Sequence, residues 1–165
     1  MNSGKPPIPV AVNLSGRQLY SQGILRTVQQ ALTGNRLPGE LLRIELTEST
    51  LMENPQQAIE VMHQFHKMNI SLAIDDFGTG YSSLSNLQKL PVDIINIDLS
   101  FIKDIGEPGF DPIIANTIIQ LAHSMGYKVI AEGVETEQQR DYLRDQGCDY
   151  VQGFYYGNPV QAEMF

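Results

Sequence analysis

The sequence predicts an α/β fold built on a parallel sheet. Short runs of β-branched and apolar residues alternate with longer segments of helical periodicity, which is typical of strands joined by crossover helices. No linker or low-complexity stretch interrupts the alternation, so the 165 residues are predicted to form one domain. A complete eight-stranded α/β barrel is typically about 250 residues long, so we expect a barrel of this type to be incomplete here.

Six strands and five helices are predicted, which makes about six βα units. The strands are Val10–Leu14, Leu42–Leu46, Ser71–Ile74, Ile94–Ile97, Lys128–Ala131 and Tyr150–Gln152. The helices, several of which end at glycine or precede proline, are Gly16–Leu32, Pro55–Met68, Ser82–Leu90, Asp111–Gly126 and Thr136–Gly147. Residues 1–8 contain glycine and proline and are expected to form a loop ahead of a domain over residues 9–165.

Composition excludes several classes of protein. The formal net charge is −8 without a Lys/Arg cluster, which argues against a DNA or RNA partner. The apolar runs are much shorter than the roughly 20 residues of a membrane span, and no signal peptide is recognisable. The single cysteine, Cys148, cannot form an intrachain disulfide, which fits a reducing compartment. We therefore expect a soluble, cytoplasmic protein that holds any anionic ligand at a local site, usually a metal.

Polar side chains gather at the carboxyl ends of the predicted strands. In a parallel α/β barrel these ends share one face, where active sites lie. Carboxylates placed together there repel one another unless a cation lies among them or some are protonated, so the acidic ring predicts a divalent metal. The residues are Asn13, Glu45, Glu48, Asp75, Asp76, Asp98, Glu132, Glu135 and Gln152.

The sharpest motif begins at Ile74, where two adjacent carboxylates end an apolar strand and the glycine-rich run Gly78-Thr79-Gly80 follows. At a strand end both carboxylates can turn toward one site, with Asp75 bridging two metal ions and Asp76 binding the second, as in two-metal phosphoester chemistry. The alternative is that Asp76 only caps the next helix.

These residues and their surroundings resemble the EAL family of cyclic-di-GMP phosphodiesterases. Six motifs match in order: Val12-Asn13-Leu14-Ser15, Glu45-Leu46-Thr47-Glu48, Asp75-Asp76-Phe77-Gly78-Thr79-Gly80, Ile97-Asp98-Leu99-Ser100-Phe101, Ala131-Glu132-Gly133-Val134-Glu135-Thr136 and Gln152-Gly153-Phe154. The resemblance implies a modified TIM-type (β/α) barrel. It also implies that divalent ions activate a water molecule that opens cyclic-di-GMP to linear pGpG.

The resemblance assigns a role to each site residue. It places Asn13, Glu45, Asp75 and Asp76 among the ligands of two metal ions, Mg²⁺ or Mn²⁺ with Ca²⁺ inhibitory. Glu132 is similar to a residue of the second metal's group and, with Asn96 and Glu48, belongs to the catalytic set, in which Glu48 braces the loop from Asp76 to Tyr81. The substrate side is assigned to Gln152, Glu135 and Asp98.

Two departures from the family pattern predict weak turnover. No Glu-Ala-Leu signature occurs in the chain, so the first strand and helix of the family are expected to be absent. Asn96 stands where the family has lysine, and losing a positioned cation costs on the order of 3 kcal/mol, about a hundredfold in rate.

Three functions remain open from the sequence. The chain is a phosphodiesterase, a degenerate receptor that binds cyclic-di-GMP without cleaving it, or a protein-interaction module. Missing strands would expose sheet edges, so a homodimer is expected. An upstream sensor or GGDEF domain is an expected neighbour in the natural chain. His63 and His66, three apart on one predicted helix, have a spacing that can bind metal, although solvated or packed histidines are the commoner explanation.

Overall fold

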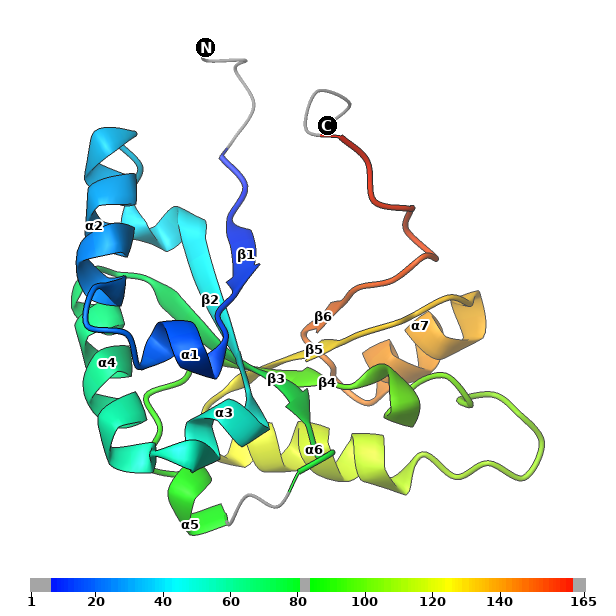
Figure 1. Ribbon diagram of the computed structural model, residues 1–165. Coiled ribbons are helices and arrows are strands. Elements are labelled where there is room, and N and C mark those ends of the chain that lie inside the picture. The colour runs from blue at the N-terminus through cyan, green and yellow to red at the C-terminus, as the bar shows by residue number, and fades with distance from the viewer. Residues whose placement is uncertain (1–6, 81–83, 162–165) are drawn as a thin grey trace. The chain divides into compact units, whose positions relative to one another are not determined.

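The computed structural model (Figure 1) describes residues 7–80 and 84–161. The chain forms two compact units. Unit 1 comprises Met1–Asp75 and Gly80–Asp93, and unit 2 comprises Asp76–Thr79 and Ile94–Phe165. All six predicted strands are present and alternate with helices, which confirms the α/β class. Within the described residues, no helix is long and apolar enough to cross a bilayer.

Unit 1 contains the parallel strands β1 (Val10–Asn13), β2 (Leu42–Thr47) and most of β3 (Ser71–Phe77). β2 pairs with both of the others. Along β2 the apolar side chains of Ile44 and Leu46 are buried, whereas the residues between them are half-buried. Successive side chains of a strand point to opposite faces, so β2 has one apolar face and one polar face.

The helices of unit 1 differ from the predicted ones near the N-terminus. The structure has α1 (Gly16–Leu19), α2 (Ile24–Gly34), η1 (Gly39–Leu41), α3 (Glu48–Glu53), α4 (Pro55–Lys67) and α5 (Leu84–Leu87). The prediction of one helix over Gly16–Leu32 is therefore wrong. The chain leaves the helix at Tyr20, whose hydroxyl donates to the Thr50 carbonyl at 2.7 Å, and re-enters it at Ile24.

Helix α3 was not predicted, because it follows β2 without any loop. The Thr47 hydroxyl accepts a hydrogen bond from the Thr50 amide and caps the helix directly at the strand end. The predicted helix Ser82–Leu90 is represented by the short α5, and Ser82 lies outside the described residues.

Helix α4 is the main amphipathic helix of unit 1. Asn54 caps it, Pro55 occupies its first turn, and Ala58, Met62 and Phe65 are fully buried at helical spacing. Helix α2 packs beside α4 (Figure 1) but buries none of its residues completely. The helix α2, which connects β1 to β2, is thus less buried than α4, which connects β2 to β3.

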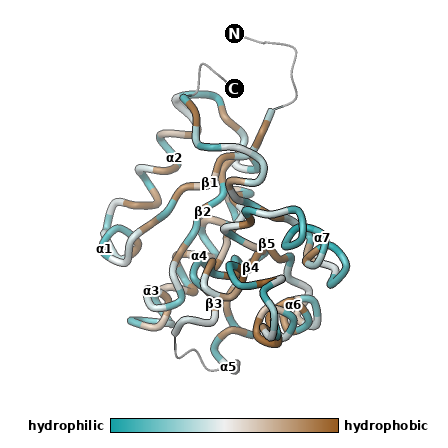
Figure 2. Tube along the Cα trace, turned by 90° about the vertical axis from the view of Figure 1, so that its right-hand side faces the viewer, coloured by the Kyte–Doolittle hydropathy of each residue, from teal (hydrophilic) through white to brown (hydrophobic). Residues whose placement is uncertain are grey.

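Unit 2 contains the parallel strands β4 (Ile94–Ile97), β5 (Lys128–Ala131) and β6 (Tyr150–Val151), with β5 pairing with both others. The short helix η2 (Leu99–Phe101) follows β4, α6 (Ile113–Ser124) leads to β5, and α7 (Glu137–Asp145) leads to β6. Figure 2 shows hydrophobic residues along α6, which packs on β4 and β5. The buried side chains of α6 are Ala115, Ile118, Ile119 and Ala122.

A hydrogen-bonded His–Asp pair stands at the beginning of β3. His66 lies in the last turn of α4, and its Nε2 is 3.1 Å from Oδ2 of Asp93. The same oxygen accepts a 2.8 Å hydrogen bond from the amide of Leu72. One carboxylate therefore ties the end of a helix to the start of the strand that follows it.

Unit 2 repeats this arrangement. His123, 57 residues after its counterpart, lies in the last turn of α6, with Nε2 at 2.8 Å from Oδ2 of Asp149. That oxygen accepts a 2.9 Å hydrogen bond from the Val129 amide at the start of β5. Partial burial tends to raise the pKa of the Asp149 carboxyl, but the bonds from His123 and Val129 outweigh it and lower the pKa below its ordinary value.

We expect Asp149→Asn to lower the free energy of unfolding by about 1 kcal/mol near neutral pH, because hydrogen bonds to a charged group are lost. The folded pKa is lowered, so this contribution is present above the ordinary pKa of 3.8 and disappears as the pH falls through the folded value. Urea unfolding of both proteins across the acidic range measures the difference. Asp145→Asn, at a mostly exposed ion pair of α7, is the control and should cost less than about 0.5 kcal/mol. Equal losses in the two variants would contradict the assignment.

Candidate active site

The unit 1 part of the predicted site lies on the polar face of the sheet. Asn13 pairs with Glu45, and Glu45 pairs with Ala73 on β3. Asp75 comes two residues after Ala73 and therefore points to the same face. The parallel register thus brings one amide and two carboxylates, from three neighbouring strands, to one face near the strand ends.

Asp76 has an unusual backbone conformation directly after Asp75. Its φ is 55°, in the left-handed region that residues other than glycine seldom occupy. The Asp76 carbonyl accepts hydrogen bonds from the amide of Thr79 at 3.3 Å and from its hydroxyl at 2.8 Å. The left-handed residue ends the alternation of β3 and starts a tight turn, which redirects the chain immediately after the two carboxylates.

Glu48 lies against Gly80 of the glycine-rich loop, and its predicted bracing role stays a prediction. It is 3% exposed, and a Cβ atom added to Gly80 would lie 2.7 Å from its Oε1. Gly80 therefore makes room for the Glu48 carboxylate. Tyr81, at the far end of the predicted contact, lies outside the described residues.

The unit 2 part of the predicted site centres on Asn96 and Glu132. Asn96 is completely buried on β4, and its Nδ2 donates a 3.0 Å hydrogen bond to Oε1 of Glu132. The Glu132 amide donates to the Ile97 carbonyl at 3.1 Å, which continues the pairing of β5 with β4 by one residue. The position where the family resemblance implies a lysine thus holds a neutral amide that is hydrogen-bonded to Glu132.

The three predicted substrate-side residues belong to unit 2 and have local partners. The Asp98 carboxylate accepts a 2.9 Å hydrogen bond from the Ser100 amide and caps η2. The Glu135 amide donates to the Gln139 side chain, while the Gln152 amide donates to Ala131 at 2.9 Å. Their roles toward a ligand stay predictions.

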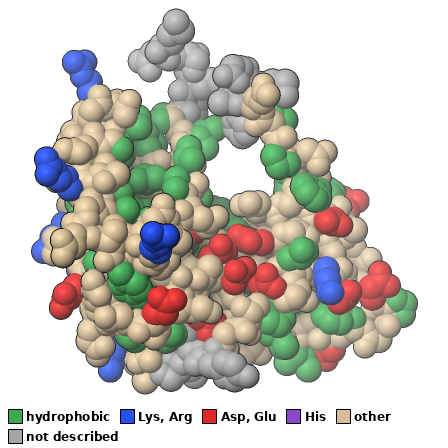
Figure 3. Space-filling view, in the orientation of Figure 1, with side chains coloured by type: hydrophobic (Ala, Val, Ile, Leu, Met, Phe, Trp, Pro, Cys, Tyr) green, Lys and Arg blue, Asp and Glu red, His purple; other side chains and the backbone are tan. Residues whose placement is uncertain are grey.

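The two units differ strongly in charge. Unit 1 has seven Lys or Arg and seven Asp or Glu, whereas unit 2 has four and twelve, so the net charge of −8 resides in unit 2. Figure 3 shows both kinds of charged side chain on one face of the molecule. In the described ranges, no group of three or more His, Cys, Asp or Glu is arranged to hold a metal ion. The predicted ligand set of unit 1 includes Asn13, whose amide oxygen belongs to none of these residue types, and it stays a prediction.

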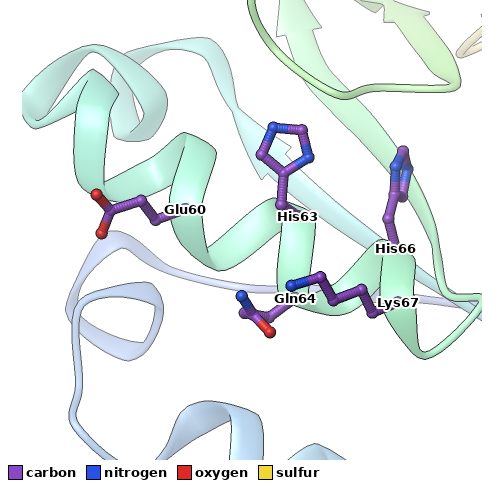
Figure 4. A pocket seen from close by; sticks show the side chains of 5 residues that line it. All are labelled: Glu60, His63, Gln64, His66 and Lys67. Carbon is purple, nitrogen blue, oxygen red and sulfur yellow. The ribbon is translucent and has the colours of Figure 1, made fainter.

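The histidines of α4 line a surface pocket of that helix. Figure 4 shows His63 and His66 on the same helix as Glu60, Gln64 and Lys67, with no side chain of another element among those that line this pocket. His66 is bonded to Asp93, as described above. These contacts favour the explanation of His63 and His66 as surface residues.

The single cysteine is not activated as a nucleophile. Burial raises the pKa of the Cys148 thiol to about 11, and its Sγ donates to the Tyr150 carbonyl at 3.2 Å. A thiol with this pKa remains protonated at neutral pH.

Known proteins are similar to this chain over nearly its whole length. The EAL domain family matches residues 1–159. The chain belongs to the EAL domain family. MucR of Pseudomonas aeruginosa, a bifunctional diguanylate cyclase/cyclic di-GMP phosphodiesterase, is 38% identical over 99% of this chain and 24% of its own length. NbdA of the same organism, a cyclic di-GMP phosphodiesterase, is 41% identical over 96% of this chain and 20% of its own. The chain thus spans about a quarter or less of these relatives.

Solved EAL structures share the fold. The PaMucR phosphodiesterase in its c-di-GMP complex matches with a TM-score of 0.90 and 39% identity over 94% of this chain and 63% of that one. The EAL domain of Mycobacterium smegmatis DcpA matches with a TM-score of 0.88 and 37% identity over 95% and 71%. The predicted TIM-type α/β fold is confirmed by these similarities.

Sequence reasoning missed two features of the EAL site. It identified the Asp75-Asp76 pair but not the left-handed backbone at Asp76, because aspartate carries no unique signal for that conformation. It also did not show why Gly80 is a glycine, which the space that Glu48 occupies requires. Glu48 and Gly80 lie far apart in the sequence, so their contact is visible only in the folded structure.

Asp76→Gly and Asp76→Ala remove the same carboxylate but differ in backbone freedom. Left-handed alanine costs about 1 kcal/mol more than glycine, so we expect the glycine variant to have the larger free energy of unfolding by about that amount. Urea unfolding of both variants tests this. Gly34→Ala at the end of α2, where an added Cβ meets nothing within 4 Å, should show the opposite preference. Equal stability of the two Asp76 variants would rule out the left-handed constraint.

Proposed function

We propose that this EAL domain hydrolyses cyclic-di-GMP to linear pGpG in bacterial second-messenger signalling. The observation that carries the proposal is the shared face of Asn13, Glu45 and Asp75, in a chain 38% and 41% identical to proteins named as cyclic di-GMP phosphodiesterases. Three oxygen donors from adjacent strands suit a hard divalent cation, and such a cation can in turn bind the phosphate groups of a ligand.

The donor set supports a requirement for divalent metal, Mg²⁺ or Mn²⁺. Carboxylate and amide oxygens are the ligands that such cations prefer, so Asn13, Glu45 and Asp75 would hold one ion. Asp76 and Glu132 would belong to the group around a second ion. When bound, the metal supplies an activated water and neutralises phosphate charge. Ca²⁺ is expected to support binding of the dinucleotide but to inhibit its hydrolysis.

The amide of Asn96 is the reason to expect slow hydrolysis of cyclic-di-GMP. A buried amide bonded to Glu132 preserves the position of that carboxylate but supplies no positive charge for the reacting phosphate. Electrostatic stabilisation by one such group is typically worth on the order of a hundredfold in rate. The same observation favours the second candidate function, a receptor that binds cyclic-di-GMP and does not turn it over.

Two measurements separate these functions. Calorimetric titration of cyclic-di-GMP in the presence of Ca²⁺ measures binding, and analysis of products with Mg²⁺ or Mn²⁺ measures cleavage. Binding with slow formation of pGpG supports the enzyme, binding without pGpG supports the receptor, and no binding would favour a protein-interaction module.

Asn96→Lys is expected to raise the rate of pGpG formation by up to about a hundredfold. A lysine here restores the missing charge and can bond Glu132 in place of the amide. Asn35→Lys adds the same charge at an exposed position of unit 1 and should leave the rate unchanged. Rapid conversion by the wild-type chain, with no gain in Asn96→Lys, would show that the amide is no handicap.

We also propose a homodimer in the cytoplasm, coupled to a sensor or GGDEF domain. β1 has only β2 as a described sheet neighbour, and its residues Val10 and Val12, with Ile8 before them, are 60%, 48% and 61% exposed. Exposed apolar side chains on an edge strand favour association. Light scattering at micromolar concentration should give twice the chain mass, and Val10→Lys, which places a charge on the edge, should lower it. A monodisperse wild-type monomer would contradict the dimer.

A further inference from the structure

The segment that follows β4 in unit 2 is anchored at both ends. The Asp98 carboxylate caps its first turn through the Ser100 amide. Ile102 and Ile105 are 0% and 5% exposed, and the Gln139 side chain donates a 3.0 Å hydrogen bond to the Lys103 carbonyl. A segment with a cap, two buried side chains and a bond to α7 presents its other side chains in fixed positions.

Two of those side chains contact glycines in the turns after β3 and β5. A Cβ added to Gly78 would lie 3.1 Å from Cε2 of Phe101 and 3.1 Å from Cδ1 of Ile118. A Cβ added to Gly133 would collide with Cδ1 of Leu99. The Phe101 ring and the Leu99 side chain therefore rest directly on the backbone of the two turns.

The two turns correspond to each other at a spacing of 57 residues. Asp75 and Asp76 precede the last residue of β3, and Glu132 and Gly133 follow β5 in the same order. The second residue of each pair is left-handed, with φ of 55° at Asp76 and 70° at Gly133. In both cases an acidic residue precedes the left-handed one. The backbone conformation of each turn therefore influences where the neighbouring carboxylate, which the proposed function uses, is placed.

From these contacts we infer that Leu99 and Phe101 are positioning residues of the active site. Phe101 holds the turn that carries Asp76, and Leu99 holds the turn that follows Glu132. Neither side chain has to touch metal or dinucleotide. The role of Asp76 and Glu132 in the active site rests on the proposed function. The packing of Leu99 and Phe101 on the two turns does not depend on it.

The exposure of Leu99 supports a positioning role over a purely stabilising one. Leu99 is 43% exposed, so much less of its surface is removed from water than for a core leucine. A left-handed residue other than glycine persists only where its surroundings hold it, and the contact of Phe101 with Gly78, two residues after Asp76, provides such support.

Amide hydrogen exchange of the metal-free protein, followed by NMR, tests the holding of the turns. In Phe101→Ala the Thr79 amide, which donates to Asp76, should exchange at least about tenfold faster, while the Val134 amide, which donates to Gln152, stays unchanged. In Leu99→Ala the Val134 amide should be the one that accelerates. Leu37→Ala, at a leucine of unit 1 that is 49% exposed, should change neither amide. Unchanged exchange, or a uniform increase over all of unit 2, would overturn the inference.

Binding of cyclic-di-GMP with Ca²⁺, measured by calorimetry, tests the consequence for the site. Residues that orient metal ligands typically contribute tenfold or more to affinity, so Leu99→Ala and Phe101→Ala should each weaken binding about tenfold, and Phe101→Leu should restore most of it. Leu37→Ala should bind like the wild type. If the wild type binds and both alanine variants bind equally well, the positioning role is wrong. If the wild type does not bind, the proposed function fails, and the exchange rates alone decide whether these side chains hold the turns.

Discussion

The parallel register of β1, β2 and β3 decides which side chains of unit 1 can act together. It aligns Asn13 with Glu45, and the period of two along β3 adds Asp75 to the same face. A shift of β2 by one residue would turn Glu45 to the other face and bring the buried Ile44 or Leu46 to the polar face, so the apolar side chains that stabilise the strand also fix the donor set. The register alone places these three side chains on one face of the sheet.

A second constraint acts where the strands end. Alternation alone would send Asp75 and Asp76 to opposite faces, and the left-handed conformation of Asp76 breaks that alternation. The corresponding position after β5 is Gly133, which adopts such a conformation without steric cost. Keeping an aspartate at the strained position is consistent with a carboxylate that is needed there, since strain of this kind is typical of functional sites. Glu48 and Phe101 contact the following glycines, so packing on the loop supports the strained residue.

The strands were predictable from sequence because their β-branched runs are short and bounded by turn residues, and the observed bounds differ from the predicted ones by at most a few residues. The break at Tyr20 was not predictable, since it depends on a hydrogen bond to Thr50, thirty residues away. The pairing of His66 with Asp93 joins residues 27 apart and likewise has no local signal. The polar residues at strand ends were identified by type, but which of them share a face required the register, and the capping role of Asp98 required the geometry of η2.

The stabilising contacts and the predicted site residues lie toward opposite ends of the same strands. β3 is tied at its beginning by Asp93 through Leu72, and it carries Asp75 at its end; β5 is tied at its beginning by Asp149 through Val129, and Glu132 follows it. With a rise of about 3.3 Å per residue, three residues separate the two functions by roughly 10 Å. Two acidic residues of unit 2, Asp149 and Glu132, therefore differ in their surroundings. Asp149 is hydrogen-bonded to a histidine and to the start of β5, whereas Glu132 accepts a hydrogen bond from the neutral amide of Asn96. Under the proposed function, an amide at position 96 in place of a lysine would leave the potential around Glu132 more negative, and this would favour cation binding over fast turnover.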